Sequence, residues 1–361
     1  GGLVNTKPSL LLEPQSTNLA LYSEDVFVYN YNDSTIRENV QIITPYGYKS
    51  QAGKIDAEFG VSSPIRAASY SLGTYSTNDV VTLSGFVKYN GYRYVQFGGY
   101  FGSESARFDL INGVITQHLS NVISSSMVQF PNDWYKLTVT YTFQNTIGNG
   151  RLYAGWVISP ESDFSFTNAP SGGIYVWGLQ AELGSYATSY IPTNGSTQTR
   201  AAETCNGAGT SSILPSEEGI LYAELKNIAN DGTNKCIAIS AGLAVNNRVT
   251  IVVGTGDNVI RPHIITNGVA VFDLTTNSFN TVDNFVKIAV RYKTNDFACW
   301  VNGTQALTDT SGNVPTGLDT LKFDVGNNTL PFYGKIRDIR VYNTKEMTDS
   351  EVDILLTKIT S

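Results

Sequence analysis

Short runs in which apolar and polar residues alternate recur along the chain, and tight-turn signals separate them. The most frequent signal is Asn-Gly, because both residues tolerate the positive φ that a type I′ hairpin turn requires. It occurs seven times, at residues 90–91, 112–113, 149–150, 194–195, 206–207, 267–268 and 302–303. Many short strands with frequent turns are typical of a sandwich or a barrel. We therefore expect an all-β protein built from antiparallel sheets.

Three of these pairs predict individual hairpins, because alternating runs lead into them. The runs lie at 85–89 and 92–97 around Asn90-Gly91, at 108–111 and 114–116 around Asn112-Gly113, and at 297–301 before Asn302-Gly303. Successive side chains of a strand face opposite sides of a sheet, so each run also predicts which residues share a face.

Only the C-terminal end carries a helical pattern. Thr348 is followed three residues later by Glu351, which is the spacing of a capping box. Four apolar residues then recur at the spacing of one helix face: Val352, Leu355, Leu356 and Ile359. We expect a short helix that packs against a sandwich.

Composition supports this interpretation and excludes others. Charged residues make up 15% of the 361 residues, whereas 33 Gly, 21 Tyr and 16 Phe favour strands and turns over long helices. The formal charge is 24 − 31 = −7 and Lys and Arg form no cluster, so nucleic acid is not an expected partner. No apolar run reaches the roughly 20 residues that cross a bilayer, so membrane insertion is not expected either.

Three cysteines, Cys205, Cys236 and Cys299, cannot all pair within one chain and do not indicate a disulfide framework.

A small, polar segment divides the chain. Residues 204–212 have a composition typical of a linker, Pro215 follows them, and strand-like alternation resumes at 219–225. The sequence therefore predicts a first domain at 1–204, a linker at 205–215 and a second domain at 216–361.

The first domain resembles jelly-roll modules of the carbohydrate-binding type that are common in phage tail and virion proteins. An ordered series of motifs carries the resemblance: 12–19 (LEPQSTNL), 21–25 (LYSED), 133–136 (DWYK), 176–185 (VWGLQAELGS), 187–193 (ATSYIPT) and 200–202 (RAA). Trp134 and Trp177 belong to this pattern, and we expect them in the core without a ligand role.

The second domain resembles concanavalin A-like sandwiches of the laminin-G type. The residues that carry this resemblance are 287–292 (KIAVRY), 298–303 (ACWVNG), 334–342 (GKIRDIRVY) and 347–351 (MTDSE). Together the two resemblances imply tandem antiparallel sandwiches, with jelly-roll and concanavalin A-like folds, in a virion or tail-fibre type of protein. Proteins of this kind lie on the outside of a particle, where they contact host glycans or act as spacers and decoration.

The residue types that catalysis requires are not arranged for it. Glycoside hydrolysis needs two carboxylates roughly 5–10 Å apart across the scissile bond, and no strand carries a run of alternating acids. His118 and His263 are the only histidines, and no nucleophile motif accompanies either. The sequence therefore predicts neither an enzyme nor a cofactor. A structural calcium ion is compatible with the polar loops at 30–33 and 309–313, although their spacing fixes no ligands.

Candidate sugar-binding residues come from strand parity, because an aromatic ring on the outer face of a sheet can stack on a sugar. In the run 297–302, Phe297, Cys299 and Val301 share the more apolar face. This parity places Trp300 and Asn302 on the outer face. Alternatively, a loop or the first domain covers Trp300.

The same argument gives a second strip in the first domain. Tyr92, Tyr94 and Gln96 share the face opposite Val95 and Phe97. A further candidate of the same sort lies in the run 151–157: Tyr153.

These observations favour a non-enzymatic surface component of a phage-like particle, a tail or head fibre or decoration that binds host-surface polysaccharide or glycan. We expect other virion proteins as partners, self-association, and a location on the virion surface or outside the cell. A shallow site of about millimolar affinity would gain roughly 10²–10⁴-fold from presentation in several copies. Two alternatives stay open. The chain is a purely structural decoration or spacer, or it consists of binding modules from a polysaccharide-degrading enzyme, since it begins with Gly1 rather than Met.

Overall fold

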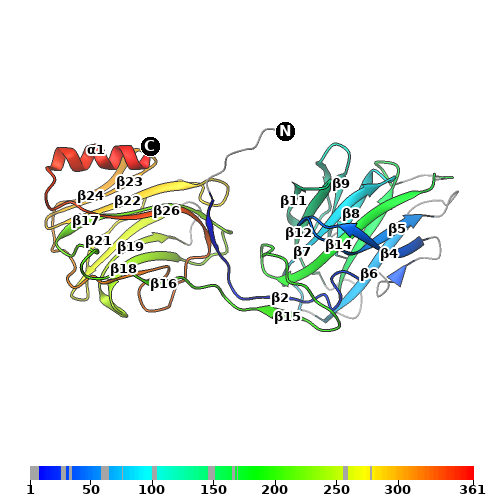
Figure 1. The fold of residues 1–361 in the computed structure, drawn as a ribbon, viewed down its shortest axis with the longest axis horizontal. Helices are drawn as coiled ribbons and strands as arrows, with labels where there is room; N and C mark the ends of the chain where they lie inside the picture. Colours follow the sequence, from blue (N-terminus) through cyan, green and yellow to red (C-terminus); the bar gives the residue numbers. More distant parts are fainter. Residues whose placement is uncertain are drawn as a thin grey trace. The chain divides into compact units, whose positions relative to one another are not determined.

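The computed structural model describes residues 8–25, 30–31, 35–57, 65–74, 76–99, 104–144, 151–164, 167–168, 170–254, 259–276 and 279–361. It gives only the backbone for 30–31, 35–37, 57, 65–74, 151–155, 206 and 244. The chain forms two compact units (Figure 1). The N-terminal unit is Gln15–Ala201, and the C-terminal unit is Ala202–Ser361 together with the residues up to Pro14.

The N-terminal unit is a sandwich of two six-stranded sheets whose strands pair in antiparallel fashion. The β8 sheet has the order β10 (Val114–His118), β9 (Ser105–Asp109), β8 (Tyr94–Gly98), β13 (Arg151–Ser159), β6 (Ile65–Thr74), β3 (Asn30–Tyr31). The β7 sheet has the order β11 (Val122–Phe130), β12 (Trp134–Thr142), β7 (Val80–Asn90), β14 (Gly172–Leu183), β5 (Lys49–Ala57), β4 (Thr35–Ile43). A short ribbon pairs β2 (Ser16–Asn18) with β15 (Gln198–Arg200). The core lies between the two sheets and includes Leu83, Phe97, Phe108 and Trp156.

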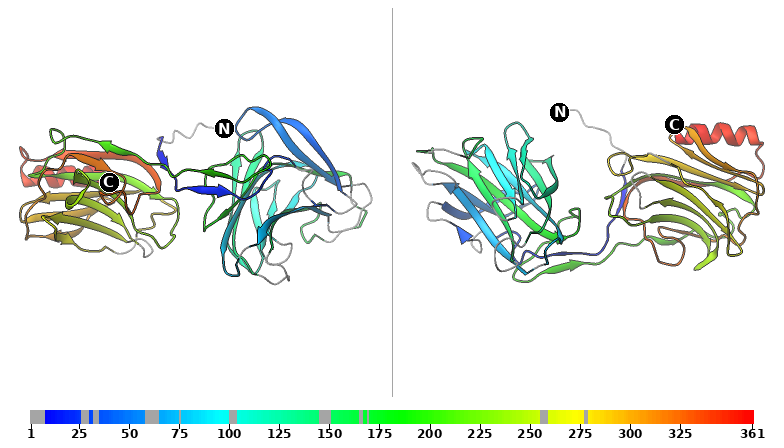
Figure 2. Two further views of the ribbon diagram at one scale, coloured as in Figure 1. Left: turned by 90° about the horizontal axis from the view of Figure 1, so that it is seen from below. Right: turned by 180° about the vertical axis from the view of Figure 1, so that it is seen from behind.

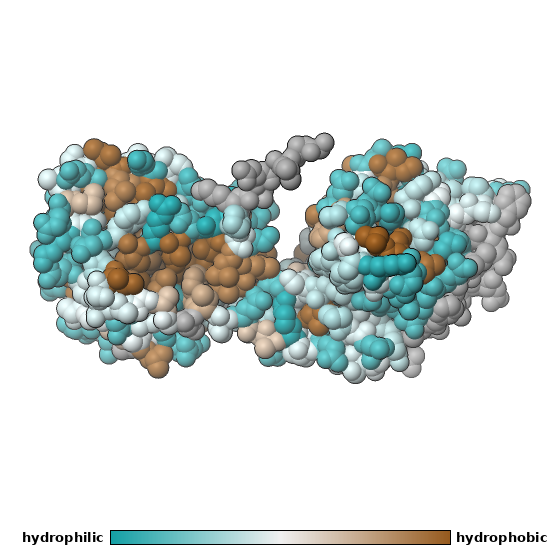
Figure 3. Space-filling model, viewed as in Figure 1, coloured by the Kyte–Doolittle hydropathy of each residue, from teal (hydrophilic) through white to brown (hydrophobic). Residues whose placement is uncertain are grey.

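The C-terminal unit repeats this architecture. The β22 sheet has the order β1 (Leu10–Leu12), β26 (Gly334–Asn343), β17 (Glu218–Asn227), β22 (Val286–Lys293), β23 (Asp296–Val301), β24 (Thr304–Asp309). The β19 sheet has the order β16 (Asn206–Ala208), β25 (Thr320–Lys322), β18 (Lys235–Ala241), β19 (Ala244–Val253), β20 (Ile260–Thr266), β21 (Val269–Asp273). Figure 3 shows an apolar band on this unit between β26 and β16, along the edge where the two sheets are open. Leu12, Phe323 and Phe332 lie in the core, with Cys205 and Tyr333 partly buried against it.

The predicted helix is confirmed. α1 (Asp349–Thr360) begins with a capping box in which Thr348 and Glu351 exchange hydrogen bonds. Val352 and Leu356 are buried, and the helix covers the outer face of the β22 sheet (Figures 1 and 2). The helix forms because its N-terminus is capped and its apolar face has a sheet to cover.

The hairpin turns follow the Asn-Gly pairs in part. At Asn267-Gly268 and Asn302-Gly303 both residues have positive φ, and the pairs join β20 to β21 and β23 to β24. The hairpin predicted at Asn90-Gly91 is wrong, because β7 and β8 belong to different sheets. The chain crosses the sandwich there, and the strand after the turn begins only at Tyr94. Asn149-Gly150 lies outside the described residues.

The division into units differs in detail from the predicted one. β1 pairs with β26, so the first strand of the chain belongs to the C-terminal unit rather than to a domain at 1–204. Within the segment predicted as a linker, 205–215, β16 pairs with β25 and Leu214 is buried in the core of the C-terminal unit. Polar composition alone does not reveal strand pairing over a few residues.

Candidate functional site

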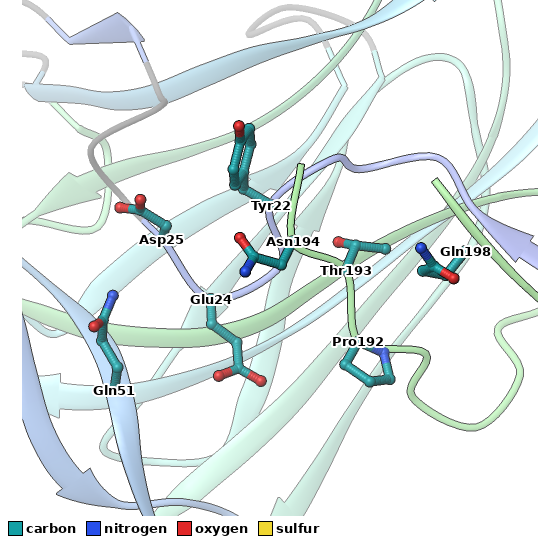
Figure 4. Close-up of a pocket in the computed structure, with 8 residues that line it drawn as sticks. All are labelled: Tyr22, Glu24, Asp25, Gln51, Pro192, Thr193, Asn194 and Gln198. Atoms are coloured by element: carbon teal, nitrogen blue, oxygen red, sulfur yellow. The ribbon is translucent and has the colours of Figure 1, made fainter. Parts of the chain in front are cut away.

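The N-terminal unit contains a polar pocket of about 650 Å³. Three segments form its walls: the chain that follows β2, the start of β5, and the chain that leads into β15. The lining residues are Tyr22, Glu24, Asp25, Gln51, Pro192, Thr193, Asn194 and Gln198 (Figure 4). One aromatic ring, three amides, two carboxylates and a hydroxyl therefore meet in one concave site.

The first and third walls are tied together by hydrogen bonds. The Ser23 hydroxyl donates to the carbonyl of Thr193 at 3.3 Å and accepts from the Thr193 N–H at 2.9 Å. Tyr22 and Asn194 form an antiparallel bridge, and the Gly195 N–H donates to the Leu21 carbonyl at 2.8 Å. Two loop segments far apart in sequence thus behave as a short ribbon, which fixes the pocket before any ligand binds.

Asn18 fastens this ribbon to β14. Its side chain is fully buried and makes four hydrogen bonds. The amide donates to the carbonyls of Leu179 and Ile191, and the amide oxygen accepts from the N–H groups of Ala20 and Ala181. A buried amide with every bond made defines one arrangement of both segments.

Gln180 and Glu182 extend the same network on the other side of β14. The Gln180 oxygen accepts from the Ile191 N–H at 2.7 Å, one residue before the pocket wall begins. The Glu182 carboxylate accepts from the N–H and hydroxyl of Thr188 and from the hydroxyl of Ser16. These residues belong to the motifs 12–19, 176–185 and 187–193, so those motifs encode the scaffold of the pocket.

Both carboxylates of the pocket are held by hydrogen-bond donors. Glu24 accepts from the hydroxyls of Tyr190 and Ser50, at 3.0 and 3.3 Å, and Asp25 accepts from the amide of Asn39 at 3.0 Å. Burial raises the pKa of Tyr190, so its hydroxyl stays protonated and donates. Glu24 and Asp25 come from one segment, and their carboxylates point in different directions (Figure 4). They are therefore not the pair that faces across a glycosidic bond in hydrolases.

The hydroxyl of Thr193 lies inside the wall of the pocket. The residue is 7% exposed, and its Oγ1 is buried without a hydrogen-bond partner among the described residues. Because this oxygen has almost no accessible surface, the groups that meet a ligand are the Tyr22 ring and the amides and carboxylates that line the pocket. The pocket thus offers acceptors, donors and one ring to a small polyhydroxylated molecule.

The structure does not assemble the strip predicted at residues 92–97. Tyr92 is fully buried, and its hydroxyl donates to the carbonyl of Pro170 at 3.0 Å, so it is a core residue and not a platform. Its assignment failed because Tyr92 lies where the chain crosses between sheets, before the strand begins at Tyr94.

Tyr94 and Gln96 do lie on the face opposite Val95. However, Gln96 is 5% exposed and bonded to Ser105 and Arg107, and the guanidinium of Arg93 lies over the Tyr94 ring. For Tyr153 the backbone lies in β13, and the side chain is outside the described part.

Trp300 lies on the predicted face and is partly buried beneath α1. Its ring packs with the helix and with Tyr222, while Cys299 and Val301 point into the core. Trp300 thus lies between the two alternatives: it is partly buried, and the helix is what packs on it. Asn302 is exposed, and its side chain accepts from the Lys287 N–H at 3.0 Å as part of the turn.

Arg291 anchors the helix above Trp300, which gives a first testable prediction. Arg291 is 7% exposed and pairs with Asp349 at 2.6 Å and with Asp353 at 3.4 Å. Because both acids are more than half exposed, water screens the pairs, and we expect Arg291→Met to weaken docking by only about 1–2 kcal/mol. Hydrogen exchange of residues 349–360 should become faster, and Arg261→Met, on the other sheet, should leave it unchanged. Equal exchange in both variants would contradict the anchoring role.

Comparisons with known proteins bear on the second unit. Residues 225–353 match the family model of the concanavalin A-like lectin/glucanases superfamily. The match runs from the end of β17 into α1, so it covers most of the C-terminal unit. Together with the antiparallel sheets and the terminal helix, it confirms the predicted fold class.

Three solved structures that align with this chain come from different organisms. The CBM40 of a Ruminococcus gnavus sialidase, bound to α2,3-sialyllactose, is 14% identical with a TM-score of 0.32 and aligns over 43% of this chain and 96% of its own. CBM66 from Bacillus subtilis is 9% identical with a TM-score of 0.28, over 41% and 87%. Domains LG4-5 of the mouse laminin α1 chain are 9% identical with a TM-score of 0.29, over 89% and 92%. No curated protein sequence matches the chain.

The described residues form neither a metal-binding cluster nor a helix that could cross a membrane. In the described ranges, no three or more His, Cys, Asp or Glu side chains group in a way that could hold a metal ion. Of the two loops considered for calcium, the one at 309–313 has its Asp309 carboxylate bonded within the loop, where it accepts from the N–H and hydroxyl of Ser311. The other loop, at 30–33, is described only at its first two residues. Of the helices described, none has the length and apolarity to span a bilayer.

Sequence reasoning did not single out the pocket. Tyr22, Glu24 and Thr193 all lie within motifs quoted for the resemblance, so the signal was present as a pattern. Strand parity identifies exposed aromatic rings only on strands. The pocket is built from loop segments that come together through Asn18 and Ser23.

Proposed function

We propose that this chain is a non-enzymatic glycan-binding component of a phage-like particle, exposed on the virion surface, and that the pocket of the N-terminal unit holds a sugar of a host-surface glycan. The observation that carries the glycan proposal is a polar pocket, built before any ligand binds, in which the ring of Tyr22 meets the amides of Asn194 and Gln198. Sugars present many hydroxyls and apolar ring faces, and this set supplies a partner for both.

Two further points support the particle setting. The motifs of the first domain resemble those of virion modules, and the two pocket carboxylates, Glu24 and Asp25, point in different directions (Figure 4), which suits binding rather than turnover. A site of this size and polarity gives about millimolar affinity, which becomes useful when other virion proteins hold several copies together.

Binding to a glycan array by the full chain, multimerised on streptavidin, tests the proposal. We expect Asn194→Ala and Gln198→Ala each to lower binding about tenfold, because each removes a hydrogen bond to the ligand. Gln117→Ala changes an exposed amide on β10, away from the pocket, and should bind as the unaltered chain does.

Other outcomes would decide between the alternatives. No binding to any glycan would favour a purely structural decoration or spacer. A catalytic domain in the same reading frame would identify the units as modules of a polysaccharide-degrading enzyme.

A further inference from the structure

The outer face of the β7 sheet carries a cluster of aromatic rings near the pocket. Phe86, Trp134 and Trp177 form its floor and are at most 1% exposed. Tyr46 and Tyr48, from the turn between β4 and β5, lie on this floor, and each is 50% exposed. We call Tyr46 and Tyr48 together the tyrosine shelf.

The shelf is held in place by its contacts. The Tyr46 ring meets Phe86 and Trp177 edge to face, with ring centroids 5.7 Å apart in both cases, and Tyr48 meets Trp177 at 6.3 Å. The turn is closed by hydrogen bonds from the Thr44 N–H to the Tyr48 carbonyl, at 2.9 Å, and from the Gly47 N–H to the Thr44 carbonyl, at 3.0 Å. These edge-to-face contacts hold both rings in place and leave half of each tyrosine exposed to solvent. A ligand that stacks on the rings therefore restricts little side-chain motion, so binding costs little entropy.

The shelf is continuous with the pocket through Glu24 and Tyr190. The Tyr190 ring lies 4.6 Å from Trp177, and its hydroxyl donates to Glu24, which lines the pocket. Ser50, two residues after Tyr48, donates to the other oxygen of the same carboxylate. Burial and the Glu24 charge raise the pKa of Tyr48, so its phenol stays protonated.

We propose that the pocket and the tyrosine shelf bind one ligand, an oligosaccharide with one sugar in the pocket and further sugars stacked on Tyr46 and Tyr48. This inference rests on the proposed function and specifies its substrate class: a run of linked sugars, not a single terminal one. Tyr48 on the shelf and Gln51 in the pocket are three residues apart. This separation is about 10 Å along an extended chain, which is longer than one sugar ring.

A glycan fits this surface better than a protein partner. Stable protein interfaces bury about 800 Å² on each side, and two half-exposed tyrosines supply only a small part of that area. The polar groups beside the rings, Glu24, Ser50 and Gln51, also match a ligand that alternates apolar ring faces with hydroxyls.

Oligosaccharide ladders test the inference. The probes are cello-, malto-, xylo-, manno- and chito-oligosaccharides of one to six residues, measured by frontal affinity chromatography on the full chain. For the ladder that binds, we expect the affinity to rise with the number of sugars. Tyr46→Ala and Tyr48→Ala should each reduce that rise by about three- to tenfold. Neither substitution should change the binding of the single sugar.

The controls separate this inference from the proposed function. Tyr48→Phe keeps the ring and should keep the rise, and Tyr89→Ala removes a tyrosine that is 44% exposed elsewhere in the unit and should change nothing. Affinity that is independent of length, with Asn194→Ala still weakening it, would overturn the inference and leave the proposed function standing. Absence of binding to every ladder and to every glycan of the array would overturn both. Self-association that Tyr46→Ala and Tyr48→Ala abolish would assign the shelf to a contact between copies instead, and would also overturn the inference.

Discussion

Asn18→Ala is expected to unfold the walls of the pocket and to lower the free energy of unfolding of the N-terminal unit by about 3–5 kcal/mol. The substitution strands two carbonyls, of Leu179 and Ile191, and two N–H groups, of Ala20 and Ala181, in a fully buried place. Each stranded group costs about 1–3 kcal/mol, and relaxation of the flanking segments recovers part of the sum. The midpoint of thermal unfolding should fall by roughly 10 °C.

Tryptophan fluorescence reports this transition, because three of the four tryptophans, Trp134, Trp156 and Trp177, lie in the N-terminal unit. Thr17→Val is the matched control, since the Thr17 hydroxyl pairs with that of Thr199 at the surface, one residue away from Asn18. It should shift the midpoint by no more than about 2 °C. A shift for Asn18→Ala as small as the control's would show that the amide network does not hold the walls. Glycan binding should be lost with Asn18→Ala even at temperatures where the unit stays folded, because Tyr22 and Asn194 are no longer held together.

Much of the fold followed from local chemistry. Asn302-Gly303 and Asn267-Gly268 predicted tight turns because only residues that tolerate positive φ close such hairpins. The Thr348–Glu351 spacing predicted α1, because the cap satisfies N–H groups that the helix itself leaves free. These features depend on residues that are neighbours in the chain, so the sequence contains all the information they need.

The errors concern contacts between distant residues. Tyr92 looked like a member of an alternating strand, but the chain leaves one sheet for the other at that point, and alternation within one run does not show which sheet it joins. Trp300 was assigned to the correct face, yet its exposure depended on a helix some 50 residues later in the chain. The pocket depended on Asn18 meeting Leu179 and Ile191, a pairing that no local pattern encodes.

The floor of the tyrosine shelf gives the second large prediction. Trp177 is 1% exposed and touches Phe86, Tyr46, Tyr48 and Tyr190. Trp177→Ala leaves a cavity beneath all of them, so we expect a loss of about 3–5 kcal/mol in the free energy of unfolding, measured by urea denaturation. The shelf loses its support at the same time, and the gain in affinity with glycan length should disappear.

A comparison of two buried tryptophans separates the cavity from the loss of a hydrogen bond. Trp134 is as buried as Trp177, but its indole N–H donates to the carbonyl of Ile43 at 2.9 Å, whereas that of Trp177 has no partner among the described residues. Substitution by Phe keeps a ring at both positions and removes the N–H. Trp134→Phe breaks a hydrogen bond that contributes about 1 kcal/mol, in addition to the smaller ring. Trp177→Phe removes a buried donor that had no acceptor, which offsets part of the lost packing. We therefore expect Trp134→Phe to be the more destabilising by about 1–2 kcal/mol, and equal losses would mean that ring volume alone decides the stability of this cluster.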